Sequence, residues 1–133
     1  KENKCEKGAY VVNLTSHESN VTLVASGTEV ELALKVQDKL KENNIHSKVV
    51  SMPCMELFDK QPEDYRKDIL EENSLIITLE AGSVMSWQKY IKNKGANLGI
   101  DKFGESAPYK EVYKHFKLSE EDITNFIQKK LRE

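Results

Sequence analysis

The sequence contains few metal-binding residues, and they lie far apart. Its 133 residues include only two cysteines, Cys5 and Cys54, and three histidines. A tetrahedral zinc site needs about four clustered ligands, and no Cys-x-x-Cys pair is present, so we expect no metal site. Two unpaired thiols favour a reducing compartment, and we therefore expect a cytoplasmic protein.

An excess of positive charge and long apolar runs are missing as well. The chain carries 20 basic and 22 acidic residues, for a formal net charge of −2. This balance argues against a nucleic acid or an anionic membrane as partner. No apolar run approaches the roughly 20 residues of a membrane helix, and the polar residues 1–7 contain no signal-peptide core. We interpret residues 1–7 as a linker or tail and residues 8–133 as one domain.

Signals for strands and helices alternate along the chain. Val21–Ala25 and Leu75–Leu79 are almost continuous apolar runs, which is typical of strands buried on both faces. A strand–helix–strand unit makes its two strands parallel. The sequence therefore predicts a three-layer α/β/α domain with a mostly parallel sheet of about five strands. The expected strands are Tyr10–Asn13, Val21–Ala25, Lys48–Ser51, Leu75–Leu79 and Ala96–Ile100.

Helices are predicted from apolar residues at helical spacing and from capping residues. Thr28 and Glu31 form a capping-box pattern before a helix that Asn43 and Asn44 end. Further helices are expected after Pro62, at Ser86–Lys92, at Tyr109–Phe116 and after Ser119. The last helix has the apolar stripe Ile123, Phe126, Ile127 and Leu131.

The loops that follow the strands are the candidate functional segments. In an open α/β sheet, ligands bind outside the carboxyl ends of the strands. We therefore expect the candidate residues to share one edge of the sheet, which serves a ligand, a neighbouring domain, or only the turns of the fold. The candidates are Gly27, Thr28, Cys54, Glu80, Asp101, Phe103 and Ser106.

Taken singly, these residues favour structural roles. The Gly27–Thr28 turn precedes a helix N-terminus that could hold an anion, but it lacks the lysine and extra glycines of a phosphate-binding loop. Glu80 follows a buried strand, which suits a catalytic carboxylate, yet it can equally accept backbone N–H groups. Asp101 is expected to turn the chain or to bind a nearby N–H. Apolar neighbours favour an inert, partly buried thiol at Cys54.

Four segments together resemble the C-terminal domain of transketolases. They are, in order, Ser26-Gly27-Thr28-Glu29-Val30, Val50-Ser51-Met52-Pro53-Cys54 with Glu56-Leu57-Phe58, Glu80-Ala81-Gly82-Ser83, and Phe103-Gly104-Glu105-Ser106-Ala107-Pro108. The resemblance extends from Gly8 to Leu131. Each motif alone is weak, whereas their order and spacing are specific.

The resemblance implies a parent enzyme larger than this chain. Such an enzyme transfers a two-carbon ketol unit between sugar phosphates in the pentose phosphate pathway, using thiamine diphosphate and a divalent metal, Mg or Ca, as a homodimer. The family's Gly-Asp-Gly metal–diphosphate motif does not occur here. The family's catalytic glutamate and phosphate ligands belong to earlier domains. The resemblance therefore implies no catalytic, cofactor-binding or metal residue in this chain, which we expect to be inactive alone and to support the dimer and the preceding domains.

Other interpretations stay open at this point. One is a regulatory module that binds a nucleotide or sugar phosphate at the edge of the sheet, which a ligand-dependent rise in Tm would reveal. Another is the C-terminal domain of a different thiamine-diphosphate enzyme, such as 1-deoxyxylulose-phosphate synthase. A third is an independent flavodoxin-like signalling or redox protein. A thiamine-diphosphate motif upstream in the same reading frame would decide for transketolase.

Overall fold

The computed structural model describes residues 7–16, 19–27, 29–71, 74–80, 95–99 and 120–132. The helices expected at Ser86–Lys92 and Tyr109–Phe116 lie outside these ranges. The elements, in chain order, are β1 Tyr10–Leu14, β2 Val21–Ala25, α1 Glu29–Glu42, β3 Ser47–Ser51, α2 Met55–Asp59, α3 Glu63–Leu70, β4 Leu75–Glu80, β5 Ala96–Gly99 and α5 Glu120–Leu131.

The described strands form one sheet in the order β1-β3-β2-β4-β5. Strands β3, β2, β4 and β5 run parallel, and only β1 is antiparallel to its neighbour β3. The prediction of a mostly parallel sheet is therefore confirmed. The predicted strand limits differ from the observed ones by at most one residue.

Strand β2 is the centre of the sheet and is buried from end to end. Each of its five residues has an exposed fraction of 0%. Val24 in β2 and Ile77 in β4 are both fully buried, as the apolar runs predict. Because side chains alternate across a strand, Leu23 and Val24 contribute to different core clusters on opposite faces.

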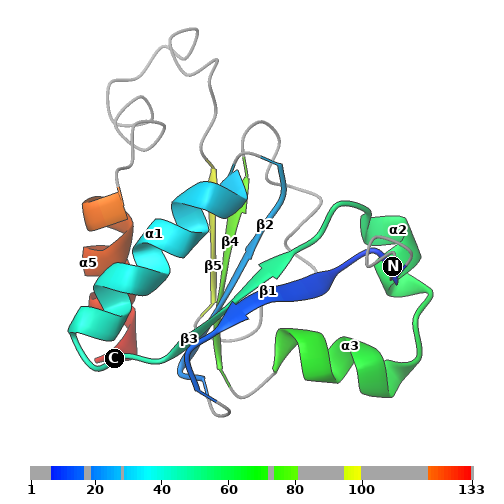
Figure 1. The fold of residues 1–133 in the computed structure, drawn as a ribbon, viewed down its shortest axis with the longest axis horizontal. Coiled ribbons are helices and arrows are strands. Elements are labelled where there is room, and N and C mark those ends of the chain that lie inside the picture. Colours follow the sequence, from blue (N-terminus) through cyan, green and yellow to red (C-terminus); the bar gives the residue numbers. More distant parts are fainter. Residues whose placement is uncertain are drawn as a thin grey trace, which may run out of the picture.

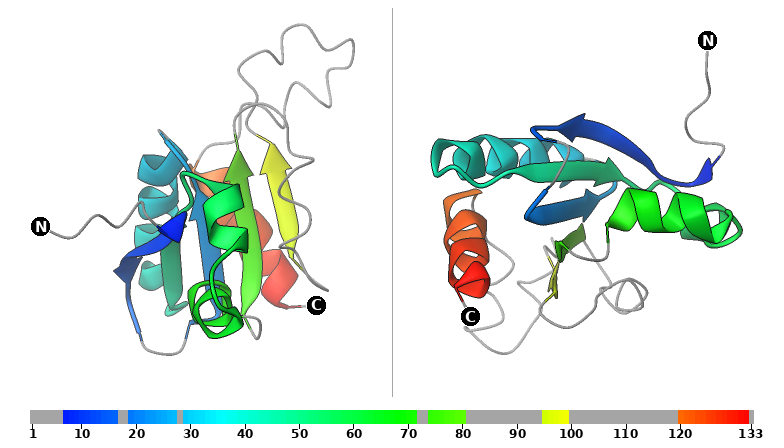
Figure 2. Two further views of the ribbon diagram at one scale, coloured as in Figure 1. Left: turned by 90° about the vertical axis from the view of Figure 1, so that its right-hand side faces the viewer. Right: turned by 90° about the horizontal axis from the view of Figure 1, so that it is seen from below.

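Helices cover both faces of this sheet. Figures 1 and 2 show α1 and α5 on one face and α2 and α3 on the other. Ala33, Val36 and Leu40 of α1 pack with Ile123 and Ile127 of α5 in the first cluster. The second cluster includes Phe58 of α2, Ile69 of α3 and the opposite side of the sheet. The three-layer α/β/α architecture is thus confirmed.

Helix α1 ends at the predicted asparagines. Asn44 adopts a left-handed conformation with φ 62°. Its N–H donates to the carbonyl of Lys41 (3.0 Å), and the N–H of Ile45 donates to that of Leu40 (2.9 Å). These two bonds are the Schellman arrangement, which satisfies the last carbonyls of a helix.

Helix α2 was not predicted. It has only five residues, and its N-cap residue Cys54 makes no side-chain capping bond. A helix this short has little stability of its own, so contacts with the rest of the fold must hold it. Phe58, with 0% exposure, anchors α2 in the core. The helix expected after Pro62 is confirmed as α3.

A buried glutamine joins α1 to the two strands at one side of the sheet. Gln37 is 1% exposed. Its Nε2 donates to the carbonyl of Ser47 (3.0 Å), and its Oε1 accepts from Nδ2 of Asn13 (2.7 Å). The register of β1 shifts between Val11 and Asn13, so these bonds fix the strand at its irregular point.

An ion pair between a buried lysine and a half-buried glutamate links β3 to the end of α3. Lys48 is 5% exposed, and its Nζ lies 2.7 Å from Oε1 of Glu71. The same Nζ donates to the carbonyls of Asp68 (2.6 Å) and Ile69 (3.2 Å). All three ammonium hydrogens therefore have acceptors, and the cation lies at the negative end of α3. Glu71 itself caps the helix with a left-handed φ of 51°.

We expect Glu71→Gln to lower the free energy of unfolding by about 1–3 kcal/mol, because Lys48 then stays buried without a counter-charge. Glutamine keeps the side-chain length. The matched control is Glu63→Gln in the exposed pair with Lys67, whose side chains are 68% and 55% exposed. That change should cost less than about 0.5 kcal/mol. Urea unfolding measures both; equal small effects would contradict the assigned role of the buried pair.

Candidate functional site

Three neighbouring parallel strands end together at one edge of the sheet, which we call the carboxyl edge. Ala25 of β2 pairs with Ser51 of β3 and with Leu79 of β4. The N–H of Met52 continues this pairing by donating to the carbonyl of Ala25 (2.8 Å). The chain therefore leaves β2, β3 and β4 from neighbouring positions. In Figure 1, β2 and β4 end at the top of the sheet, and β3 ends lower and to their right.

Three of the candidate residues belong to these strand ends. Gly27 follows β2, Cys54 follows β3, and Glu80 is the last residue of β4. The other candidates, Thr28, Asp101, Phe103 and Ser106, lie outside the described residues. A common role for all seven in binding or docking stays a prediction.

Gly27 is required by its backbone conformation rather than by crowding. Its φ is +60°, and a Cβ added there would meet no atom within 4 Å. Its carbonyl accepts from the N–H of Val30 (3.2 Å), and that of Ser26 accepts from the N–H of Glu29 (3.2 Å). The glycine thus provides the left-handed turn that starts α1.

Cys54 connects β3 to α2. Its backbone is extended, with φ −147° and ψ 104°, and its carbonyl accepts from the N–H of Phe58 (3.2 Å). The thiol is free and half-buried. The partial burial agrees with the sequence interpretation, whereas the inertness of the thiol stays a prediction.

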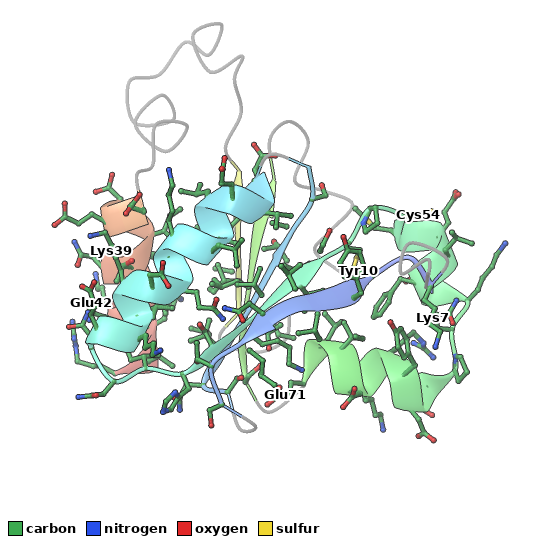
Figure 3. All side chains as sticks on the ribbon, in the orientation of Figure 1. Lys7, Tyr10, Lys39, Glu42, Cys54 and Glu71 are labelled. Carbon is green, nitrogen blue, oxygen red and sulfur yellow. The ribbon has the colours of Figure 1, made fainter. Side chains whose placement is uncertain are left out.

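The segment Lys7–Ala9, which we call the strap, lies against the Cys54 region and was missed in the sequence. Gly8 has φ +84°, and a Cβ there would overlap the carbonyl oxygen of Cys54 and the amide nitrogen of Phe58. The N–H of Cys54 donates to the carbonyl of Gly8 (3.2 Å). Figure 3 shows Lys7 and Cys54 beside α2, far from Glu71. Gly8, shortly before the expected strand Tyr10–Asn13, was the sequence feature that could have indicated this close contact.

Tyr65 of α3 fixes the other side of the strap. Its hydroxyl donates to the carbonyl of Ala9 (2.7 Å), and Nζ of Lys7 lies 4.7 Å from its ring centroid. Ala9 is fully buried. The hydrogen bond and the buried methyl group hold Ala9, and the cation–π contact holds Lys7. The bond from the N–H of Cys54 holds Gly8 between them.

The described residues supply no cluster of potential metal ligands. Among them, no group of three or more His, Cys, Asp or Glu side chains could hold a metal ion. A divalent cation that binds a diphosphate prefers oxygen ligands. Of the described candidates Gly27, Cys54 and Glu80, only Glu80 carries a carboxylate. We assign no catalytic step to these residues. No helix within the described ranges is long and apolar enough to cross a membrane.

Comparison with protein-family models shows the family to which the chain belongs. The family model "Transketolase-like TK C-terminal domain" matches residues 8–119. The chain belongs to this family. The observed α/β/α domain and the order of the sequence motifs agree with the assignment.

Transketolases from different organisms match almost the whole chain. The Bacillus subtilis transketolase is 39% identical over 125 residues, covering 92% of this chain but 19% of that protein. The chloroplastic transketolase of Solanum tuberosum is 38% identical over 120 residues, covering 88% and 16%. The transketolase structure from Campylobacter jejuni superposes with TM-score 0.78 at 35% identity, covering 96% and 19%. The chain thus spans less than a fifth of these transketolases.

The two described glycines with positive φ allow a matched test of the strap. Gly27→Ala should lower the free energy of unfolding by about 1–2 kcal/mol, the cost of a left-handed alanine with free space around its Cβ. Gly8→Ala has that cost and an overlap with the backbone of α2, so it should lower the free energy by more than about 3 kcal/mol. Denaturant unfolding of both variants measures the difference. Equal effects would show that Gly8 does not pack against α2 as described.

Proposed function

We propose that this chain serves as the supporting C-terminal domain of a longer transketolase. That enzyme transfers a two-carbon ketol unit between sugar phosphates of the pentose phosphate pathway, in the cytoplasm. The proposal rests on the difference between two coverages, that of this chain by its relatives and that of the relatives by this chain. Matching transketolases align with about nine-tenths of this chain, whereas the chain covers less than a fifth of them.

The chemistry of the parent enzyme lies, in this proposal, outside the chain. The parent uses thiamine diphosphate with Mg or Ca, held by domains that precede this one. Two facts support the division. The sequence lacks Gly-Asp-Gly, and the described residues contain no group of three or more His, Cys, Asp or Glu side chains that could hold a metal ion. The chain alone is accordingly inactive.

Within the parent, residues 8–133 act as the domain and residues 1–7 as the linker to it. The carboxyl edge, with the seven candidate residues, docks against the preceding domains and so supports the homodimer. An exposed leucine supports this orientation. Leu57 on α2 is 39% exposed, directly after the loop that leaves β3. Burying such a side chain against a neighbouring domain removes apolar surface from water.

The chain offers a matched pair of leucines that separates the carboxyl edge from the rest of the surface. Leu14 is 41% exposed, close to the 39% of Leu57, but it pairs with Lys48 near the start of β3, at the opposite edge. In the parent enzyme, Leu57→Ala should weaken dimer or interdomain stability by about 1–3 kcal/mol, as loss of an interface anchor does. Analytical ultracentrifugation and thermal unfolding measure this effect.

Leu14→Ala should change the dimer or interdomain stability of the parent by less than about 0.5 kcal/mol, because Leu14 lies on the surface away from the carboxyl edge. Michaelis constants for the sugar phosphates should be unaffected by either change. Two results would contradict the proposal. If both variants were equally stable, the carboxyl edge would not dock through Leu57. If Leu57→Ala changed a Michaelis constant strongly and left stability intact, the carboxyl edge would be a ligand site instead.

A further inference from the structure

The strap and the Cys54 region are joined by contacts on two sides. On one side, the N–H of Cys54 donates to the carbonyl of Gly8 (3.2 Å). On the other side, Tyr65 holds the carbonyl of Ala9 at 2.7 Å and packs its ring 6.4 Å from that of Phe58. Phe58 is the buried anchor of α2. Tyr65 therefore contacts both the strap and the helix that the strap covers.

Helix α2 depends on these contacts because it is the shortest of the described helices. It has five residues, compared with 14 in α1 and 12 in α5. Its first turn lacks a side-chain cap, and Phe58 is its one fully buried residue. Few buried contacts and a short hydrogen-bonded segment are the physical conditions for local opening in a folded protein.

The centre of the sheet has none of these weaknesses. Its central strand is completely buried and is hydrogen-bonded to parallel neighbours on both sides. The free energy needed to open β2 or β4 should therefore approach that of global unfolding. Among the described residues, the buried centre of the sheet thus lies next to a weakly held segment, residues 53–59, at the carboxyl edge.

We propose that the strap is a latch for this segment. While Lys7–Ala9 lies on α2 and α3, residues 53–59 stay closed; when the strap detaches, they open while the sheet stays folded. If the chain is part of a transketolase, as proposed above, the strap would transmit a movement of the preceding domain to the carboxyl edge. The latch itself does not rest on that function, because every contact lies within this chain.

Amide hydrogen exchange of the 133-residue chain, followed by NMR, tests the latch. Tyr65→Phe removes the hydrogen bond to Ala9 and keeps the ring. The Cys54 amide, which bonds to the strap, should then exchange about threefold to tenfold faster, the factor expected from one lost hydrogen bond. In the unmodified chain, low urea should leave the Cys54 rate nearly unchanged but accelerate exchange of the Ile77 amide in β4, because only global unfolding exposes much surface.

Thr22→Val is the matched control. The hydroxyl of Thr22 lies 2.6 Å from that of Ser74, away from the strap, so its loss also removes one hydrogen bond. Thr22→Val should accelerate hydrogen exchange of the Ile77 amide, which exchanges through global unfolding. It should leave the exchange rate of the Cys54 amide unchanged. The latch proposal is wrong if Tyr65→Phe does not accelerate hydrogen exchange of the Cys54 amide. It is equally wrong if Thr22→Val accelerates Cys54 and Ile77 by the same factor, because Cys54 would then open only with the whole fold.

Discussion

The parallel pairing of β2 with β3 and β4 is the constraint on which the rest of the structure depends. A strand that is buried on both faces and both sides has no freedom of register, since a one-residue slip would exchange its two core faces. The pairing of Ala25 with Ser51 and Leu79 fixes where all three strands end. It therefore determines which loops share the carboxyl edge, and it forces helices to cover both faces of the sheet.

The two edges of the sheet are built differently. Buried polar groups gather toward the amino ends of the strands, where Lys48 binds Glu71 and Gln37 binds Ser47. The side chains of Lys48 and Gln37 have hydrogen-bond partners, so they fix the geometry without an unpaired buried charge. The carboxyl edge instead has a left-handed glycine, a free thiol and a short helix with an exposed leucine. Such a division suits a domain that is rigid at one end and makes contacts at the other.

Most of the fold could be predicted from the sequence, because the runs Val21–Ala25 and Leu75–Leu79 and the apolar stripe of α5 are local patterns. The missed features depend on distant partners. Tyr65 and Ala9 are 56 residues apart, and Gln37 and Asn13 are 24 apart, so no periodicity connects them. Helix α2 is too short for a periodic signal. Of the candidate site, Gly27 could be read from its turn, but the strap beside Cys54 could not, since only the folded chain brings Gly8 there.

The chain belongs to the transketolase C-terminal family. We propose that the cofactor chemistry of the parent enzyme lies outside this chain. Calorimetric titration of the isolated chain with thiamine diphosphate and Mg²⁺ tests this claim most directly, with the parent transketolase as positive control in the same buffer. The account predicts saturable binding to the parent and no saturable heat from the chain up to millimolar cofactor. Saturable micromolar binding to the chain would contradict it.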